Sequence, residues 1–275
     1  MKTRVISAAC AIVLLAVIVY LGGIAIGIAV SVLAFIGIIE FYKALSKSGF
    51  KPVYALGCIS CVPLLYAAVS GMLPEELLLD RADIALAGAM LVFVFIVVLF
   101  CLIMFTDGRY GTKDAAATLF GIAYVVFPLS FVTLTRHMDK GYLYIWMIFI
   151  GAWATDTFAY FFGVTMGKTK IVPKISPKKS LEGCVGGVVG CAAAMTAFGA
   201  YFNSILGVSL VHYVILGLIC GVISQLGDWS ASVIKRAAGI KDYGNIMPGH
   251  GGVLDRVDSI LFTAPAVFFY ISIFF

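Results

Sequence analysis

Charged residues are scarce in this 275-residue chain, and their scarcity excludes an ordinary soluble domain. Only 12% of the residues are Asp, Glu, Lys or Arg, and 62% are hydrophobic. The mean hydropathy is +1.08. Soluble proteins carry about 25% charged residues. The composition therefore predicts an integral membrane protein, and we expect an all-α, polytopic fold.

The sequence also lacks two features that would indicate other functions. We find no internal repeat, whereas many transporters are built from duplicated halves, and this disfavours an ion-coupled transporter. Cys58 and Cys61 form a C-x-x-C pair, but neither a second pair nor a histidine accompanies them. Helix packing is therefore the expected role of the seven cysteines.

Uninterrupted apolar stretches predict about nine transmembrane helices, each near the roughly 20 residues that cross a bilayer. Gly22 and Gly23 separate the first two stretches, which we interpret as a tight helical hairpin. We divide the chain into residues 1–140, with about five spans, and residues 141–275, with about four spans. The predicted spans are 5–21, 24–42, 52–70, 84–105, 115–135, 142–163, 183–203, 208–227 and 259–275.

Basic residues are distributed unevenly between the two sets of loops. Sixteen of the nineteen lysines and arginines fall on one side, and Arg81, Arg136 and Lys140 fall on the other. Basic loops remain in the cytoplasm, so the pattern predicts a cytoplasmic N-terminus and an external C-terminus. The cytoplasmic charge could attract anionic lipid headgroups or a polyphosphate.

The predicted loop after the sixth span, GKTKIVPKISPKKSLEG, is rich in lysine. Its prolines stop a helix and are expected to hold the segment extended. Ser176, Lys178 and Lys179 are candidates to bind a lipid phosphate, and a solvated loop that only sets the topology is the alternative. Asp156 lies within the preceding span. An ionisable group at that depth indicates a functional site, or else a residue that caps or pairs inside the bundle.

Carboxylates gather at the ends of the last two predicted spans. Asp228, Ser232 and Lys235 fall at i, i+4 and i+7, so a helix presents them on one face. Asp255 and Asp258 share a face where the ninth span begins, although they could merely stabilise the helix dipole. Three neighbouring carboxylates repel unless a cation neutralises them. Oxygen ligands without a nearby cysteine favour Mg²⁺ or Mn²⁺ over zinc, so we expect one or two divalent ions.

Glycines lie between these two groups of carboxylates, in the stretch MPGHGG that includes Gly251 and Gly252. They break the helix and leave backbone N–H groups bare. Such groups can cradle phosphate oxygens because no side chain prevents close approach. The sequence thus predicts a combined metal and phosphate site where the membrane meets the cytoplasm.

This segment resembles the signature of the phosphatidate cytidylyltransferases, the CDP-diacylglycerol synthases. The pattern spans 27 residues with fixed spacing, and Met247 is its one departure, an apolar change of similar volume. DTFAYFFG and PKISPKKSLEG look like a second block of the family, whereas the first 140 residues match only in hydropathy. The signature residues here are Ser232, Lys235, Arg236, Lys241, Asp242, Gly244, Pro248, His250, Gly251, Gly252, Asp255, Arg256 and Asp258.

The resemblance implies that CTP and phosphatidic acid react to give CDP-diacylglycerol and pyrophosphate, with Mg²⁺ required. Because both substrates are anions, the protein has to supply cations and positioning. The assigned metal ligands are Asp228, Asp255 and Asp258. The assigned catalytic residues are Lys235, Arg236, Lys241, His250 and Arg256. The assigned substrate-binding residues are Ser232, Gly251, Gly252, Ser176, Lys178, Lys179 and Asp156.

Two other functions stay open at this stage. A CTP-dependent kinase of a lipid alcohol needs similar phosphate-binding groups, and a transporter could use Asp156 as an ion site. We expect a homodimer, partly from the family and partly from the glycine-rich seventh span, and we expect no nucleic-acid polymer as partner. The expected location is the plasma membrane, a bacterial inner membrane, with the active site on the cytoplasmic side.

Overall fold

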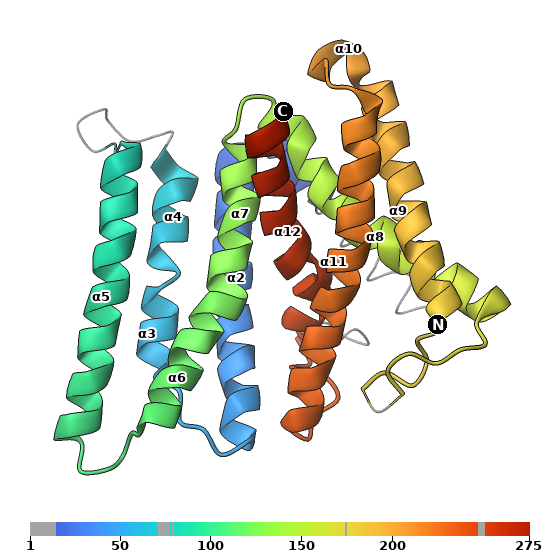
Figure 1. The fold of residues 1–275 in the computed structure, drawn as a ribbon. Helices are drawn as coiled ribbons and strands as arrows, with labels where there is room; N and C mark the ends of the chain where they lie inside the picture. Colours follow the sequence, from blue (N-terminus) through green and yellow to red (C-terminus); the bar gives the residue numbers. More distant parts are fainter. Residues whose placement is uncertain (1–14, 71–77, 79, 174, 247–250) are drawn as a thin grey trace.

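The computed structural model describes residues 15–70, 78, 80–173, 175–246 and 251–275. Within these residues the backbone forms helices and connecting loops without a β-strand (Figure 1). The predicted all-α membrane fold is thereby confirmed. The elements are α2 (Gly23–Lys47), α3 (Tyr54–Ile59), α4 (Val62–Val69), α5 (Arg81–Phe105), α6 (Thr112–Gly121), the π-helix η3 (Ile122–Val126), α7 (Phe127–Arg136), α8 (Gly141–Met166), α9 (Leu181–Tyr201), α10 (Asn203–Leu206), α11 (Leu210–Ala237) and α12 (Leu254–Phe274).

Seven helices in the described part of the chain are long and apolar enough to cross a membrane. They correspond to seven of the nine predicted spans. The predicted span 52–70 instead forms the short helices α3 and α4, with Pro63 in the first turn of α4. Proline has no N–H to donate, so it favours the start of a new helix there. The count of nine crossings stays a prediction.

The first predicted span lies mostly outside the described residues. Its last part, residues 15–21, is helical. The helix ends at Gly22, whose φ of +97° is a backbone conformation that glycine adopts readily and other residues avoid. The predicted break at Gly22 and Gly23 is therefore present, because α2 begins at Gly23.

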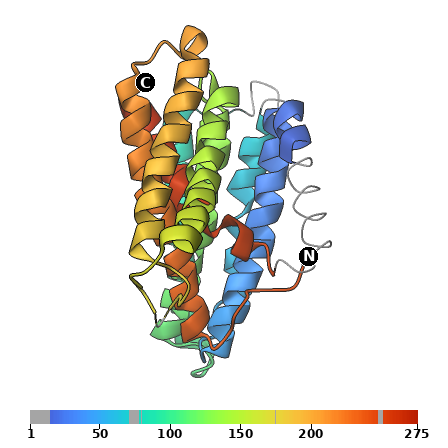
Figure 2. The same ribbon diagram turned by 90° about the vertical axis from the view of Figure 1, so that its right-hand side faces the viewer.

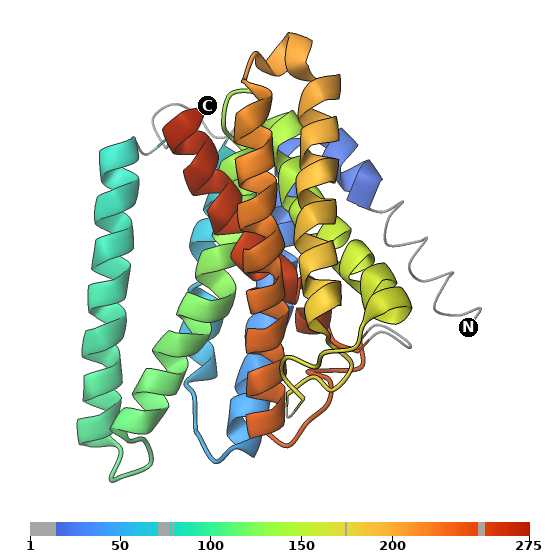
Figure 3. The ribbon, with the colours of Figure 1, turned by 45° about the vertical axis from the view of Figure 1, so that its right-hand side comes forward.

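One hydrophobic core joins helices from both halves of the sequence. It contains buried residues of α2, α7, α8, α9, α11 and α12, and α12 crosses the middle of the bundle (Figure 3). Tyr213, Leu216 and Leu254 are among its fully buried side chains. Helix α5 lies at one edge of the bundle beside α3 and α4, and most of its large apolar side chains are exposed (Figure 1). That exposure suits a lipid-facing helix.

The basic segments lie at one end of the bundle. Figures 1 and 2 show the C-terminal ends of α2 and α11, the turn between α5 and α6, and the loop before α9 at this end. Helix α10 and the C-terminal end of α12 lie at the opposite end (Figure 2). The helix directions therefore bring the lysine-rich loop, the end of α11 and the start of α12 together, which positions the candidate site.

The glycine-rich helix α9 packs against α8 of the same chain. A Cβ added at Gly187 would lie 3.0 Å from both the Ala159 Cβ and the Thr155 carbonyl oxygen. Phe158 and Phe162 of α8 fill the space beside Gly190 and Gly186 in the same way. Small residues allow this close approach of two membrane helices. Since the glycine face is used within the chain, it gives no support to a dimer, and the homodimer stays a prediction.

This packing predicts that Gly187→Leu destabilises the bundle. The added side chain has no room against α8, so we expect the free energy of unfolding to fall by about 1–3 kcal/mol. Thermal unfolding in detergent measures the change. Val189→Leu is the matched control, because Val189 is 58% exposed on the same helix and should melt like the wild type. Equal melting temperatures for both variants would contradict the described packing.

Candidate active site

An ion pair between Lys235 and Asp255 joins the C-terminal end of α11 to the N-terminal end of α12. The Lys235 Nζ lies 2.6 Å from the Asp255 Oδ1, and both residues are buried. The second oxygen of Asp255 accepts hydrogen bonds from the backbone N–H of Tyr243 at 2.8 Å and of Gly252 at 3.0 Å. Both oxygens of Asp255 thus accept hydrogen bonds. The carboxylate joins Tyr243 to Gly252, the two ends of the loop between α11 and α12 that we call the signature loop.

Tyr243, in the loop between α11 and α12, contacts both residues of this ion pair. Its ring lies beside the Lys235 ammonium, with 5.4 Å between the Nζ and the ring centroid, and its hydroxyl donates to the Ala231 carbonyl at 3.2 Å. Burial, followed by the nearby Tyr124 and Asp255, raises the pKa of the Tyr243 hydroxyl far above its ordinary value. The phenol therefore stays protonated at neutral pH and acts as a hydrogen-bond donor.

A second group of carboxylates comes from three different helices. Asp156 of α8, Asp228 of α11 and Asp258 of α12 are close enough for their charges to interact. Lys179 forms an ion pair with Asp228, and its Nζ lies 5.8 Å from the centroid of the Trp229 ring. Like charges brought this near to one another are stabilised by a nearby cation or by protonation of one carboxyl group. In the structure the Lys179 ammonium is such a cation.

A pocket of about 300 Å³ opens beside this group. Asp156, Asp228 and Gln225 line one part of it, and Ser176, Lys178 and Lys179 line another. Gln225 donates to the Cys184 and Gly221 carbonyls, while its own side-chain oxygen is buried without a hydrogen-bond partner. The pocket is thus lined by both acidic and basic groups. One lining residue, Gln225, also has a buried side-chain oxygen that accepts no hydrogen bond.

The lysine-rich loop is folded in turns, so the expectation of one extended segment is wrong. Lys170 and Ser180 form an antiparallel bridge. Within the stretch from Val172 to Lys179, backbone hydrogen bonds close turns. Glu182 accepts the backbone N–H groups of Lys168 and Thr169. These local hydrogen bonds satisfy backbone groups that no helix pairs in this segment. They also fix the loop so that Lys178 and Lys179 line the pocket.

The remaining predicted site residues lie around these two centres. Arg236 is exposed and donates to the carbonyls of Ile175 and Ile240, which links the end of α11 to the lysine-rich loop. Lys241 and Arg256 are exposed, and Arg256 interacts electrostatically with Asp156. Ser232 is partly buried. His250 lies outside the described residues. Gly251 and Gly252 begin the described segment that leads into α12, and Gly251 has a φ of +86°.

Glu40 was not predicted as a site residue. It lies on α2, is only 3% exposed, and accepts the backbone N–H groups of Val253 at 3.1 Å and Leu254 at 2.9 Å. The signal was available, because Glu40 is a single acidic residue within a predicted apolar span, like Asp156. An ionisable group at that depth indicates a structural or functional partner.

The sequence belongs to the cytidylyltransferase family. The model of that family matches residues 2–274, which is nearly the whole chain. The chain is also similar to individual curated proteins. The phosphatidate cytidylyltransferase of Staphylococcus aureus (strain COL) is 35% identical over 267 residues, which cover 96% of each chain. That of Staphylococcus saprophyticus is 35% identical over 268 residues with the same coverage. That of Thermotoga maritima is 33% identical over 212 residues, 76% of this chain and 75% of its own.

The paired carboxylate predicts a large stability loss when only its cation is removed. Lys235→Met leaves Asp255 buried without a counter-charge, which should lower the free energy of unfolding by about 3–5 kcal/mol. The double variant Lys235→Met with Asp255→Asn removes that buried charge and should recover part of the loss. Lys241→Met, at an exposed lysine of the same segment, is the control and should unfold like the wild type. Unfolding of the purified protein in detergent gives all four values, and a Lys235→Met protein as stable as the wild type would refute the pairing.

Proposed function

We propose that this protein transfers CMP from CTP to phosphatidic acid, forming CDP-diacylglycerol and pyrophosphate. The observation that carries the proposal is a pocket in which Asp156 of α8 and Asp228 of α11 lie together with the lysines of the loop before α9. Cytidylyltransferase family membership and relatives named phosphatidate cytidylyltransferase support the choice of substrates. A reaction between two anions needs such a set of cations and positioning groups.

The chemistry joins a lipid phosphate to a nucleotide phosphate. A phosphate oxygen of phosphatidic acid bonds to the α-phosphorus of CTP, the bond from that phosphorus to the bridging oxygen breaks, and pyrophosphate leaves with the electron pair. We assign Ser176, Lys178 and Lys179 to the lipid phosphate because they line the pocket. Tyr160 and Val164 line the same pocket and are each 68% exposed, so acyl chains can approach along α8 from the lipid.

A divalent cation fits the donor set around Asp228. Carboxylate oxygens are the ligands that Mg²⁺ prefers, and the Lys179 ammonium already occupies a cation position at Asp228. In the described residues, however, no three acidic, histidine or cysteine side chains converge tightly enough to hold an ion in the present arrangement. We therefore assign Asp228, which becomes available when Lys179 turns to the substrate phosphate, and Asp258 as the ligands. A bound Mg²⁺ would neutralise phosphate charge there. Asp255, also predicted as a ligand, would first have to release Lys235.

The proposed orientation places the site in the cytoplasm. The end of the bundle that carries the site also carries the C-terminal end of α2, the turn between α5 and α6 and the end of α11 (Figures 1 and 2). These segments contain Lys43, Lys47, Arg109, Lys113 and Arg236. Basic loops stay on the cytoplasmic side of a membrane, where CTP is available, and bacterial relatives make the plasma membrane the expected location.

Product analysis distinguishes this function from its alternatives. With purified protein in detergent, phosphatidic acid and CTP labelled on either the α- or the γ-phosphate, we expect α-label in the lipid and γ-label in pyrophosphate. A lipid-alcohol kinase would instead place γ-label in the lipid and release CDP, and it would do so only with diacylglycerol, which has a free hydroxyl that phosphatidic acid lacks. Turnover in detergent, where no compartment is sealed, would also argue against transport. Diacylglycerol in place of phosphatidic acid is the control and should accept no label.

The metal proposal predicts loss of activity with the structure retained. Asp228→Asn and Asp258→Asn should each lower kcat by about 100-fold or more at saturating Mg²⁺, because ions that bridge phosphates supply several kcal/mol of transition-state stabilisation. Steady-state kinetics of pyrophosphate release measure this, and circular dichroism checks the fold. Asp139→Asn, an exposed carboxylate in the turn before α8 at the opposite end of the bundle, should keep full activity. Wild-type rates in both site variants would contradict the assignment.

A further inference from the structure

Glu40 caps a helix to which it does not belong. The N-cap residue of α12 is Val253, whose side chain has no oxygen with which to accept the first N–H groups of the helix. Glu40 reaches these groups from α2, with Oε1 3.1 Å from the Val253 nitrogen and Oε2 2.9 Å from the Leu254 nitrogen. An anion at this position satisfies otherwise unpaired donors and also interacts favourably with the helix dipole.

The same carboxylate touches the glycines of the signature loop. A Cβ added at Gly252 would lie 2.5 Å and 2.6 Å from the two Glu40 oxygens, and one at Gly244 would also collide with Oε1. A side chain at either position would have to displace the Glu40 carboxylate from the N–H groups that it binds. Glycine at Gly244 and Gly252 therefore allows the close approach of Glu40 from a distant part of the sequence.

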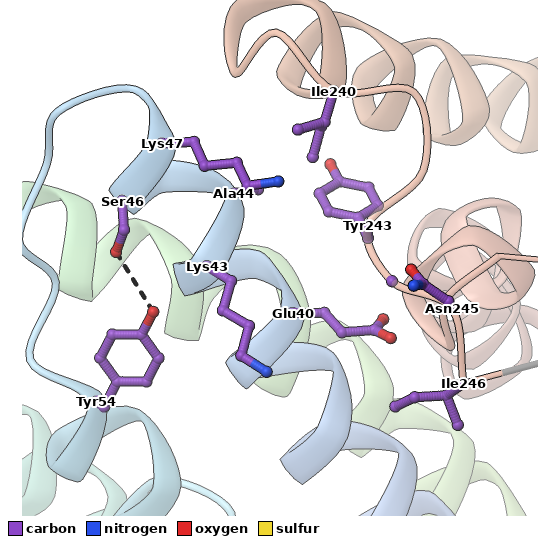
Figure 4. Close-up of a pocket in the computed structure, with 11 residues that line it drawn as sticks. Glu40, Lys43, Ala44, Ser46, Lys47, Tyr54, Ile240, Tyr243, Asn245 and Ile246 are labelled. Carbon is purple, nitrogen blue, oxygen red and sulfur yellow. Dashed lines mark hydrogen bonds between the residues drawn. The ribbon is translucent and has the colours of Figure 1, made fainter.

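Two carboxylates from different helices therefore hold the loop. Asp255 binds the N–H groups of Tyr243 and Gly252, and Glu40 binds those of Val253 and Leu254. Glu40 also forms part of the wall of a pocket of about 620 Å³, together with Lys43, Lys47 and Asn245 (Figure 4). That volume lies within the range of small-molecule sites. The loop backbone is thus one wall of a hollow on the side of α2.

We propose that Glu40 is a positioning residue for CTP: it fixes the backbone at Gly244 and at residues 252–254 in the conformation that receives the nucleotide phosphates. Glu40 acts through the loop and does not touch the reacting atoms. The inference rests on the proposed function, because it assumes that the glycine-rich loop binds CTP. It adds α2, which lies far from the signature in sequence, to the parts of the chain that determine nucleotide binding.

Glu40→Gln tests this role with a minimal change of shape. The amide keeps one acceptor oxygen but presents its NH₂ to the second backbone N–H, so one hydrogen bond is lost and the other is no longer charge-assisted. We expect kcat/KM for CTP to fall by about tenfold or more, whereas KM for phosphatidic acid stays near the wild-type value. Rates are expressed per folded molecule, so that a loss of stability alone does not alter them.

Asp114→Asn is the matched control. Asp114 also accepts two backbone N–H groups through its two oxygens, from Lys51 at 2.6 Å and Gly111 at 2.9 Å, but it caps α6 outside the site. The same chemical change there should leave both kinetic constants unaltered. Hydrogen exchange gives a second readout: Glu40→Gln should speed exchange in peptides covering 244–254, and Asp114→Asn should not.

A double-mutant cycle tests the contact itself. Gly252→Ala should impair CTP use strongly in the wild type, because the new methyl group meets the Glu40 carboxylate. In a Glu40→Ala background that obstacle is gone, so the further effect of Gly252→Ala should be several-fold smaller. Fully additive effects would contradict the proposed contact.

The outcomes separate this inference from the proposed function. An active wild type with unchanged CTP kinetics in Glu40→Gln would overturn the positioning role, as would a variant that only unfolds more readily. A wild type that does not use CTP and phosphatidic acid would instead refute the proposed function. In that case the exchange of the 244–254 peptides still decides whether Glu40 fixes the loop.

Discussion

Acidic side chains placed at the ends of apolar helices have to be compensated, and this constraint organises the functional end of the molecule. Asp255 is neutralised by Lys235, Asp228 by Lys179, and Glu40 by two backbone N–H groups. Each compensation joins segments that are distant in sequence. A buried charge without its partner is strongly unfavourable, so these contacts specify how α2, α11, α12 and the lysine-rich loop meet.

The same constraint links structure to chemistry. A site for two anionic substrates must contain cations and oxygen ligands, and these groups need partners of their own before substrate arrives. In this protein Lys179 and Asp228 neutralise each other across the pocket. In the proposed reaction, a phosphate and a metal ion would replace this internal pair, and both side chains would then serve catalysis. The Lys235–Asp255 pair is more buried and is tied to the loop backbone, which suits a supporting role.

Much of the fold and part of the site could be predicted from the sequence. Seven predicted spans correspond to long helices because hydropathy and span length are local properties. The broken span at α3 and α4 was missed, although Pro63 gave a local signal. In the site, the spacing of Asp228 and Lys235 correctly indicated one helix face. It could not show that Asp255 belongs with Lys235 while Asp258 lies with Asp156 and Asp228, since that division depends on how α8, α11 and α12 cross. Glu40 was missed because its partners are backbone groups more than 200 residues away, which no local pattern reveals.

The position of a bound metal ion decides whether Asp228 and Asp258 are the metal ligands that we propose. Crystals of the protein grown with Mn²⁺ in place of Mg²⁺ give an anomalous signal that identifies the ion without reference to activity. The account predicts that this signal lies against Asp228 and Asp258, with the Lys179 ammonium displaced from Asp228. An ion bound elsewhere, with the Lys179–Asp228 pair still intact, would contradict it.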